Sequence, residues 1–304
     1  MISIVIPSYN EQDNIVPTYE AIHNVLQKEH IDYEIIFIDD GSMDNTYVNI
    51  HKLSVLHENV KGLSFSRNFG KEAAIFAGLE AAAGDCAVIM DCDLQHPPAL
   101  LPRMYELWKQ GYEVVEAIKT DRGKESGFHR MCANAFYRII SRLTRLDMKN
   151  ASDFKLLDRK AIDSLLIMPE RTPFFRALSS WIGFHTIQVP FEVQERTIGT
   201  SKWSFWSLMK YALRNITSFS GAPMQLVTFL GWLMLILSVG FSAEALWRYF
   251  SGTSVEGFTT VIIMLSWIGS VLMISLGIIG HYISRIYDEI KARPRYIISK
   301  RCGY

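Results

Sequence analysis

The sequence predicts an α/β fold, in which a mostly parallel sheet is flanked by helices and is followed by interfacial helices and two transmembrane helices. Two observations lead to this prediction. Short apolar runs alternate with longer helical patterns through the first third of the chain, as in layered α/β domains. Near the C-terminus, two long stretches contain no Asp, Glu, Lys or Arg.

The expected strands and helices alternate in order along the chain. The strands are predicted at 2–6, 34–38, 62–65, 86–90 and 113–117, and the helices between them at 13–28, 44–56, 71–83 and 98–110. In a parallel α/β sheet, ligands bind beyond the carboxyl ends of the strands. The polar residues that directly follow these strands are therefore the first candidates for a functional site.

The two uncharged stretches, 215–243 and 257–284, each exceed the roughly 20 residues that cross a hydrocarbon core. We expect spans at 224–246 and 258–282, and a pair of buried core helices is the less favoured alternative. The segment between the two expected spans, 247–257, has Arg248 and Glu256 as its only charged residues. Basic residues flank the pair of stretches on both sides: Lys202, Lys210, Arg214, Arg285, Lys291, Arg293, Arg295, Lys300 and Arg301.

The positive-inside rule then predicts a multi-pass protein of the cell membrane with both termini in the cytoplasm. The N-terminus lacks a basic and apolar leader and is expected to form the first strand. The expected domains are a cytoplasmic domain (1–200), a juxtamembrane amphipathic helix region (201–222), two transmembrane helices with a short external loop (223–284) and a basic cytoplasmic tail (285–304).

Aromatic and basic side chains interleave between Trp203 and Arg214, as in a helix that lies in a membrane interface. An ordinary amphipathic core helix is the alternative for this segment. The basic cluster from Lys291 to Arg301 is expected to set the orientation and to contact anionic lipid headgroups. Glycines in the two spans allow close helix packing, so a homo-oligomer is an option.

Composition excludes some other classes of protein. Lys plus Arg and Asp plus Glu both number 31, which gives a formal net charge of +0 and no global electrostatic attraction to nucleic acid. The four cysteines show no C-x-x-C spacing, so neither a disulfide framework nor a zinc site is predicted.

Polar clusters follow three of the expected strands. Asp91-Cys92-Asp93 places two carboxylates where hard cations such as Mg2+ and Mn2+ find oxygen ligands. Asp39-Asp40-Gly41-Ser42 could present a carboxylate to a nucleobase or to ribose hydroxyls, or it could be a plain Asp-Gly turn. Ser66 to Lys71 opens a helix, as a phosphate or sugar site requires, and helix capping is its alternative. The coincidence of three such clusters favours a ligand site.

These residues resemble a known family. The motifs Pro7-x-Tyr9-Asn10-Glu11, Asp39-Asp40-Gly41-Ser42, Ser66-Arg67-Asn68-Phe69-Gly70-Lys71, Asp91-x-Asp93-Leu94-Gln95 and Arg196-x-x-Gly199-x-Ser201-Lys202-Trp203 occur in this order. Together they resemble the family 2 inverting glycosyltransferases that glycosylate polyprenyl phosphates, above all the bactoprenol glucosyltransferases, with dolichol-phosphate mannose synthase a more distant relative. His96 departs from the pattern, because many relatives carry an acidic residue there.

The resemblance implies a GT-A fold that binds a nucleoside-diphosphate sugar, with UDP-glucose the first guess and galactose, N-acetylglucosamine and mannose still open. It implies a divalent metal ion, Mg2+ or Mn2+, held by Asp91 and Asp93. The implied donor-binding residues are Pro7, Tyr9, Glu11, Asp39, Lys71, Asp91 and Gln95. The implied acceptor is polyprenyl (undecaprenyl) phosphate at the cytoplasmic face of the membrane, within a cell-envelope pathway.

Basic side chains should meet the acceptor phosphate, because one guanidinium group can bind two phosphate oxygens at once and Lys adds a point charge. Arg122, Arg130, Arg196 and Lys202 are the candidates, and ordinary surface charges are the alternative for Arg122 and Arg130. Asp153 matches an acidic residue that the family places near the acceptor. A phosphate acceptor is already largely ionised at neutral pH, so Asp153 is expected to orient the acceptor or to take a proton role.

Other functions are less favoured. A processive polysaccharide synthase would need more spans and a Q-x-x-R-W motif, and the sequence has neither. A partner of a lipid-linked-sugar flippase, or a non-catalytic scaffold of lipid-linked sugar export, is the alternative from another class. A scaffold, however, has no need for Asp93 at a strand end.

Overall fold

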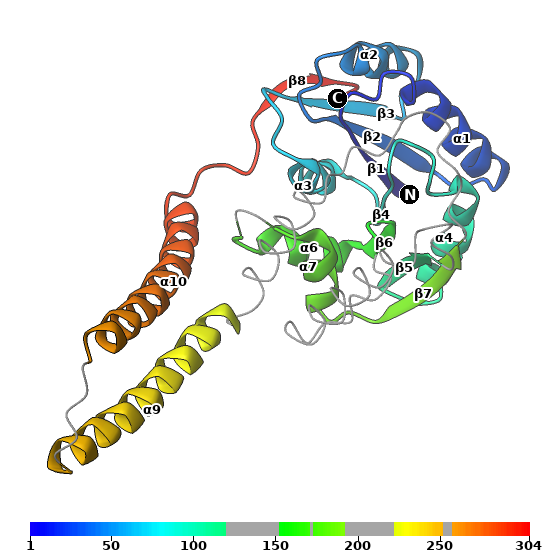
Figure 1. The fold of residues 1–304 in the computed structure, drawn as a ribbon. Coiled ribbons are helices and arrows are strands. Elements are labelled where there is room, and N and C mark those ends of the chain that lie inside the picture. Colours follow the sequence, from blue (N-terminus) through cyan, green and yellow to red (C-terminus); the bar gives the residue numbers. More distant parts are fainter. Residues whose placement is uncertain (120–151, 171–172, 192–221, 252–256) are drawn as a thin grey trace. The chain divides into compact units, whose positions relative to one another are not determined.

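The computed structural model describes residues 1–119, 152–170, 173–191, 222–251 and 257–304. Two compact units are present (Figure 1). The first contains the sheet with its helices and also the last residues of the chain, Arg293–Tyr304. The second contains two long helices, α9 and α10.

Within the described residues, eight strands form one sheet in the order β7-β5-β6-β4-β1-β2-β3-β8. Their bounds are Ile2–Ser8 (β1), Tyr33–Asp39 (β2), Val60–Phe65 (β3), Cys86–Ile89 (β4), Val114–Lys119 (β5), Lys155–Asp158 (β6), Thr186–Phe191 (β7) and Ile298–Cys302 (β8). The pairs β1–β2, β1–β4, β2–β3 and β5–β7 are parallel. The pairs β4–β6, β5–β6 and β3–β8 are antiparallel. The prediction of a mostly parallel α/β sheet is therefore confirmed.

Helices cover both faces of this sheet (Figure 1). One face carries α1 (Ile15–Lys28), α2 (Thr46–Leu56) and α4 (Leu101–Lys109), with the short 3-10 helix η1 (Pro98–Leu100) before α4. The other face carries α3 (Lys71–Ala81), α6 (Arg159–Ile167) and α7 (Phe175–Trp181).

Successive side chains of a strand point to opposite faces of the sheet, and in this sheet the apolar residues on both faces pack against helices. Ile2, Ile4 and Ile6 are fully buried and belong to the core cluster that the apolar side of α1 completes, as expected for residues two apart on a strand. On the opposite face, Val5 contacts α3 closely. A Cβ atom added to Gly78 of α3 would lie 2.2 Å from Val5 Cγ1, so the absence of a side chain lets the helix approach the sheet.

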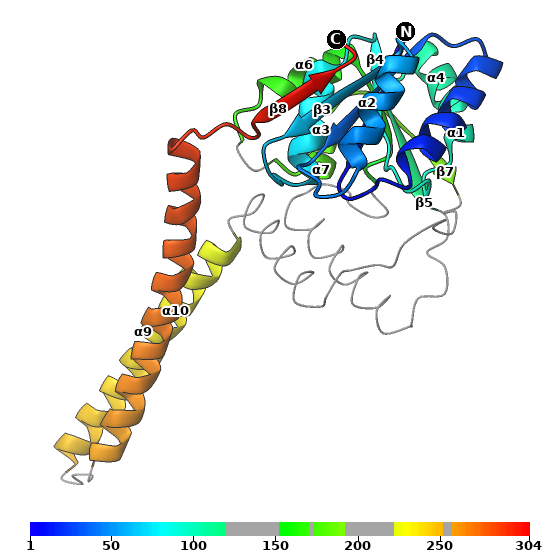
Figure 2. The same cartoon turned by 90° about the horizontal axis from the view of Figure 1, so that it is seen from above.

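The five strands and four helices expected from the sequence are all present, with ends that differ by a few residues. Three further strands, β6, β7 and β8, were not expected. The C-terminal strand is the largest departure, because Ile298–Cys302 pairs antiparallel with β3 at the edge of the sheet instead of forming part of a separate tail (Figure 2). Without β8, β3 would present an unpaired edge, which proteins usually cover.

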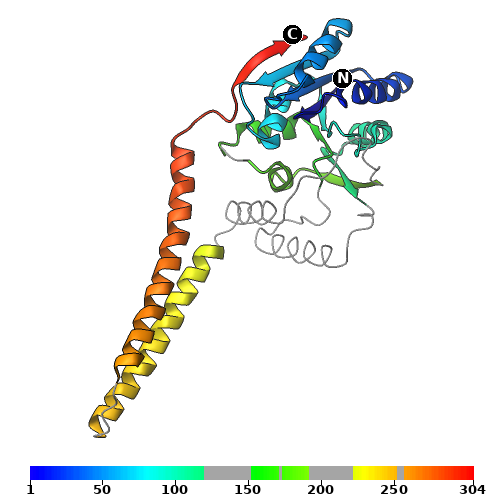
Figure 3. The same cartoon turned by 45° about the horizontal axis from the view of Figure 1, so that its top comes forward.

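The second unit contains α9 (Ala222–Phe250) and α10 (Phe258–Ile290), which contact each other (Figure 3). Among the described residues, one helical segment, Trp267–Ile290, is long and apolar enough to cross a membrane, and Val227–Phe241 is a shorter apolar stretch. The expectation of two spans at 224–246 and 258–282 therefore stays a prediction. The expected interfacial segment from Trp203 to Arg214 lies outside the described residues.

Candidate active site at the carboxyl edge of the sheet

Three strand ends lie side by side at one edge of the sheet. The register places Ser8 of β1 opposite Asp39 of β2, and Asp39 opposite Ser64 of β3. The loop after β1 is tied to the loop after β2, because the backbone N–H of Asn10 donates to Ser42 Oγ at 2.9 Å and the N–H of Met43 donates to Asn10 Oδ1 at 3.0 Å. The loops therefore form one connected rim.

Asp39 and Asp40 fix this rim from within. Asp39 is 2% exposed and accepts hydrogen bonds from the N–H of Ser42 and from Ser64 Oγ. Asp40 accepts from the N–H groups of Phe69 and Gly70 at 2.7 and 2.9 Å. Burial raises the pKa of Asp40, while these two hydrogen bonds act against that rise. Both carboxylates thus hold the turn and the next loop in place, in line with the turn-forming alternative stated for this motif.

The acidic pair follows β4. Cys92 is buried, whereas Asp91 and Asp93 on either side of it are half-exposed. The next residue, Leu94, has a φ of 57°, which is uncommon for a bulky residue and is typical of strained functional loops. His96 Nδ1 accepts the N–H of Asp91 at 3.1 Å, and its ring stacks on Phe154 at 4.8 Å. His96 therefore supports the acidic turn from behind.

Asp153 reaches the same edge from a distant part of the chain. Strand β6 runs antiparallel to β4 and pairs Lys155 with Ile89, so the residues just before β6 lie next to the residues just after β4. This explains how Asp153 comes close to Asp91. Asp153 is 5% exposed, and a buried carboxylate requires cationic or hydrogen-bonding partners.

Asp91, Lys71, Asp153 and Arg176 form a row of alternating charges. Lys71 Nζ lies 2.6 Å from Asp91 Oδ1 and 2.8 Å from Asp153 Oδ2. The Arg176 guanidinium contacts both oxygens of Asp153, at 2.6 Å from Nε and 2.9 Å from Nη2. The two cations together occupy both oxygens of Asp153, in the bidentate geometry that makes arginine pairs strong.

This row shifts the pKa of each member. Burial alone would raise the pKa of Asp153, but Lys71 and Arg176 outweigh it and hold that pKa well below the usual range. Burial would also raise the pKa of Asp91, but the charge of Lys71 outweighs it and lowers that pKa. Burial would lower the pKa of Lys71, yet the carboxylates of Asp153 and Asp91 raise it. All three groups are therefore charged at neutral pH, and Asp153 is a weak proton acceptor.

A second acidic group connects the two helices that supply the cations. Glu72, next to Lys71 in α3, accepts the N–H of Phe175 at the start of α7 at 2.9 Å. Burial, followed by the charge of Asp153, raises the pKa of Glu72 to about 7. The buried Lys155 donates to Ser179 of α7 at 2.9 Å. Helix α7 is thus held from two sides, which fixes the direction of Arg176.

The structure brings most of the described candidates to one edge. Pro7, Tyr9 and Glu11 follow or end β1, Lys71 begins α3, and Asp91, Asp93 and Gln95 follow β4. Tyr9 is 46% exposed and available to a ligand, whereas Asp39 is turned into the rim. Arg122, Arg130, Arg196 and Lys202 lie outside the described residues.

Sequence reasoning missed Arg176 and Glu72. Arg176 follows the apolar pair Phe174-Phe175 in a segment without a strand-end signal. Its partner Asp153 is 23 residues away and Lys71 is 82 residues from Asp153, so local pattern gives no sign of the contact. Glu72 is adjacent to Lys71 in a motif already singled out, and its position in the first turn of a helix was the available signal.

The acidic pair fits a hard divalent cation. Asp91 already attracts one cation, the Lys71 ammonium group, and Asp93 adds a second half-exposed carboxylate. Within the described parts of the chain, no group of three or more His, Cys, Asp or Glu side chains could hold a metal ion by itself. In proteins, Mg2+ is commonly held by one or two carboxylates, and substrate phosphates complete its coordination.

The strand order, the helices on both faces of the sheet and the acidic turn after β4 define a GT-A-like glycosyltransferase fold. The chain belongs to glycosyl transferase family 2, whose model matches residues 3–166. The resemblance stated from the motifs and the prediction of a glycosyltransferase are thereby confirmed.

Three comparisons illustrate these relationships. An uncharacterized glycosyltransferase of Synechocystis is 37% identical, covering 99% of this chain and 96% of that protein. The bactoprenol glucosyl transferase of Shigella phage SfII is 36% identical, covering 98% and 97%. The solved structure of glucosyl-3-phosphoglycerate synthase from Mycobacterium tuberculosis, in complex with Mn2+, UDP and phosphoglyceric acid, shares the fold, with a TM-score of 0.51 and 19% identity over 73% of this chain and 78% of that one.

Proposed function

We propose that the protein transfers one sugar, glucose as the first candidate, from a nucleoside-diphosphate sugar to a polyprenyl phosphate such as undecaprenyl phosphate. The observation that carries this proposal is the 36% identity, over nearly the full length of both chains, to a phage protein named bactoprenol glucosyl transferase. The charged row at the carboxyl edge supports it, because the reaction brings two phosphate-bearing substrates together.

On the donor side, Asp91 and Asp93 would hold a divalent metal ion. Such an ion, when bound, stabilises the negative charge that develops on the departing nucleoside diphosphate. Lys71 would add a positive charge beside the departing diphosphate, and its contacts with Asp91 and Asp153 at this edge support that role. The fold relative solved with Mn2+ and UDP supports a divalent metal ion at this site by analogy.

On the acceptor side, a phosphate oxygen would attack the anomeric carbon as the bond from that carbon to the diphosphate oxygen breaks, which inverts the configuration in one step. The acceptor needs no base, because a phosphate monoester with a second pKa of about 6 is already largely ionised at pH 7. The low pKa of Asp153 and its two ion pairs favour a positioning role. Asp153 would orient Lys71 and Arg176, whose charges attract the phosphate.

The pairing of β8 with β3 supports two membrane crossings. Both strands belong to one sheet, so the chain between them must cross a membrane an even number of times. If the apolar segment Trp267–Ile290 crosses once, a second crossing is required, and among the described helices α9, with its apolar stretch Val227–Phe241, could supply it. A cytoplasmic sheet would then place both termini in the cytoplasm, in agreement with the basic residues that flank the spans.

A transfer assay tests this function. Purified protein is incubated with undecaprenyl phosphate and a panel of radiolabelled UDP- and GDP-sugars, with Mn2+ or with EDTA. We expect labelled lipid from one donor, lost with EDTA and reduced at least about 100-fold in Asp93→Asn, because the metal would lose a carboxylate ligand.

Asp163→Asn is the matched control, since Asp163 is an exposed carboxylate on α6, away from the strand ends, with one long ion pair. It should behave like the wild type. Absence of labelled lipid with every donor, from folded protein, would reject the enzymatic function and favour a partner or scaffold role in lipid-linked sugar export.

A further inference from the structure

We propose that Arg295 is a positioning residue for the charged row, and that it holds the helix carrying Lys71 against the segment that leads into the helix carrying Arg176. Arg295 lies between α10 and β8, five residues after the end of α10 at Ile290. It lies far from Lys71 and Arg176 in sequence, and of the features discussed above only the basic cluster from Lys291 to Arg301 includes it.

The guanidinium of Arg295 contacts the end of α6. Its Nε donates to the carbonyl of Glu170 at 3.0 Å, and its Nη2 donates to the carbonyl of Met168. Met168 directly follows α6, and the last carbonyls of a helix lack partners within it. A positive charge is favoured at this end of a helix, and a planar guanidinium can serve two carbonyls at once.

The same guanidinium packs on α3. Its Cζ lies 4.9 Å from the centre of the Phe76 ring, and Phe76 is almost completely buried. Helix α3 begins with Lys71 and holds the start of α7 through Glu72 and the N–H of Phe175. Arg295 therefore contacts both α3 and the segment between α6 and α7.

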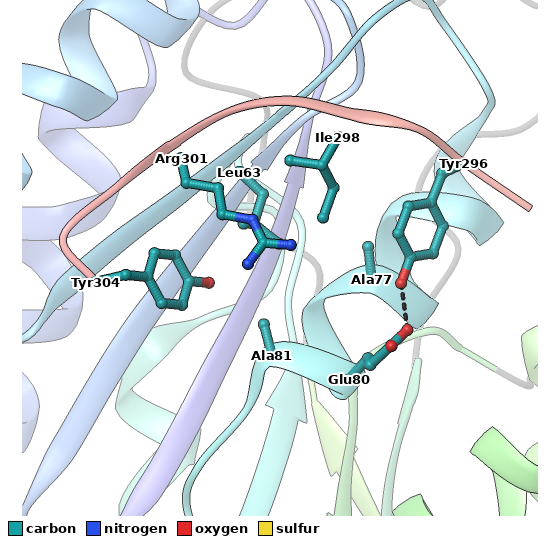
Figure 4. Close-up of a pocket in the computed structure, with 8 residues that line it drawn as sticks. All are labelled: Leu63, Ala77, Glu80, Ala81, Tyr296, Ile298, Arg301 and Tyr304. Carbon is teal, nitrogen blue, oxygen red and sulfur yellow. Dashed lines mark hydrogen bonds between the residues drawn. The ribbon is translucent and has the colours of Figure 1, made fainter.

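Neighbouring residues fix Arg295 in this position. Tyr296 stacks on Phe65 at 5.0 Å, and its hydroxyl donates to Glu80 of α3 (Figure 4). The N–H of Ser66, the first residue of the loop before Lys71, donates to the carbonyl of Ile297 at 3.0 Å. Beyond Tyr296, a cavity of about 480 Å3 separates the side chains of β8 from α3. The segment between α10 and β8 therefore contacts α3 through Arg295 and Tyr296.

Because Asp153 is held by one cation from α3 and one from α7, a relative shift of these helices changes the spacing of the whole row. Small misplacements of positioned groups cost large factors in rate. Removing Arg295 should therefore slow transfer without altering a residue that touches substrate. This inference rests on the proposed function, in that sugar transfer is the activity it modulates.

The test compares Arg295→Ala and Arg295→Lys with Lys109→Ala as the control. Lys109 is an exposed cation that lies over the Tyr105 ring of α4, on the face of the sheet opposite α3. We expect Arg295→Ala to lower kcat about tenfold with less than about a twofold change in the KM for the sugar nucleotide. Arg295→Lys should show a smaller loss than Arg295→Ala, because lysine keeps the positive charge but lacks the planar guanidinium that serves two carbonyls at once. Lys109→Ala should match the wild type.

A double-mutant cycle with Arg176→Lys distinguishes positioning from a general loss of stability. If Arg295 acts through Arg176, the combined variant should lose less than the product of the two separate factors, since coupled sites are not additive. Multiplicative losses, or an unchanged kcat in Arg295→Ala, would overturn the proposal.

Hydrogen exchange provides a readout that does not depend on the reaction. In Arg295→Ala, amides of 173–181 should exchange faster while those of 2–8 in the central strand stay protected. If the wild type transfers no sugar, the proposed function fails and this comparison decides alone. Unchanged exchange across 173–181 would then overturn the positioning role, and faster exchange confined to that segment would support it.

Discussion

At the scale of single residues, Asp153 connects two cations that come from different helices. Lys71 belongs to α3 and Arg176 to α7, and both contact the same carboxylate. A buried carboxylate with two bound cations is suited to holding charges at fixed distances. We infer that this residue determines the spacing of the positive charges that would meet a phosphate.

Glu72 gives the first prediction, which concerns pH. Its pKa is raised from 4.5 to about 7 by burial and by the charge of Asp153. The folded protein therefore binds this proton more tightly than the unfolded chain does. By linkage, the contribution of Glu72 to stability is greatest below about pH 4.5 and is lost as the pH rises to about 7.

Glu72→Gln removes this titration and keeps an oxygen that can accept the Phe175 N–H. We expect the variant to be more stable than the wild type by about 1–3 kcal/mol at pH 8 and nearly equal to it at pH 4.5. Chemical unfolding of both proteins at the two pH values measures the difference. The same difference at both pH values would show that Glu72 does not titrate in this window.

At the scale of elements, the turn after β2 gives a second prediction. Gly41 has a φ of +68°, and a Cβ added there would lie 2.4 Å from the backbone carbonyl carbon of Arg67. Gly70 has a φ of +100° with no heavy atom within 4 Å of its added Cβ. The two glycines differ in the space around them.

Gly70→Ala should cost about 1–3 kcal/mol through backbone strain alone, because a φ of 100° with a ψ of 157° is a conformation that essentially only glycine adopts. Gly41→Ala should cost about 1–3 kcal/mol more, because the loop from Ser66 to Gly70 must move away from the turn. Unfolding in denaturant gives both values. Equal losses would mean that the approach of the two loops is looser than the structure has it.

The elements that the sequence predicted are those with a strong internal pattern. The strands β1 to β4 are buried apolar runs, and α1 shows apolar residues at helical spacing. The missed strands lack such a pattern. β6 begins and ends with a charged residue, Lys155 and Asp158, β7 contains Pro190 at the edge of the sheet, and β8 carries Lys300 and Arg301 among its five residues. Their pairing depends on partners far away in sequence.

The candidate site divides in the same way. The strand-end carboxylates Asp91 and Asp93 could be located from sequence, because they follow a buried strand directly. The contacts of Lys71 with Asp153 and of Asp153 with Arg176 could not, because they depend on β6 lying antiparallel beside β4. The proposed base contact of Asp39 had a turn-forming alternative, and the buried, hydrogen-bonded carboxylate of the structure supports that alternative.

At the scale of the whole molecule, β8 links the end of the chain to its beginning. Strand β3 precedes the long helices α9 and α10, and β8 follows them, yet both strands lie in one sheet. The two helices must therefore enter and leave on the same side of any membrane that they cross.

This arrangement predicts the topology. Ser254→Cys, in the segment between the two helices, should react with a membrane-impermeant maleimide in intact cells. Ser299→Cys, on β8, should react only after the cells are opened. Reaction of both in intact cells, or of neither, would contradict the hairpin of two crossings with a cytoplasmic sheet.

The most direct test of the proposed sugar transfer is mass-spectrometric identification of the lipid product. Purified wild type and Asp153→Asn are incubated with UDP-glucose and undecaprenyl phosphate. We predict a lipid one hexose heavier than the acceptor from the wild type, and at least about a 100-fold lower rate in the variant, because Lys71 and Arg176 lose their shared anchor. Equal rates in the two proteins, or no glycosylated lipid with UDP-glucose or any other nucleotide sugar, would contradict the account.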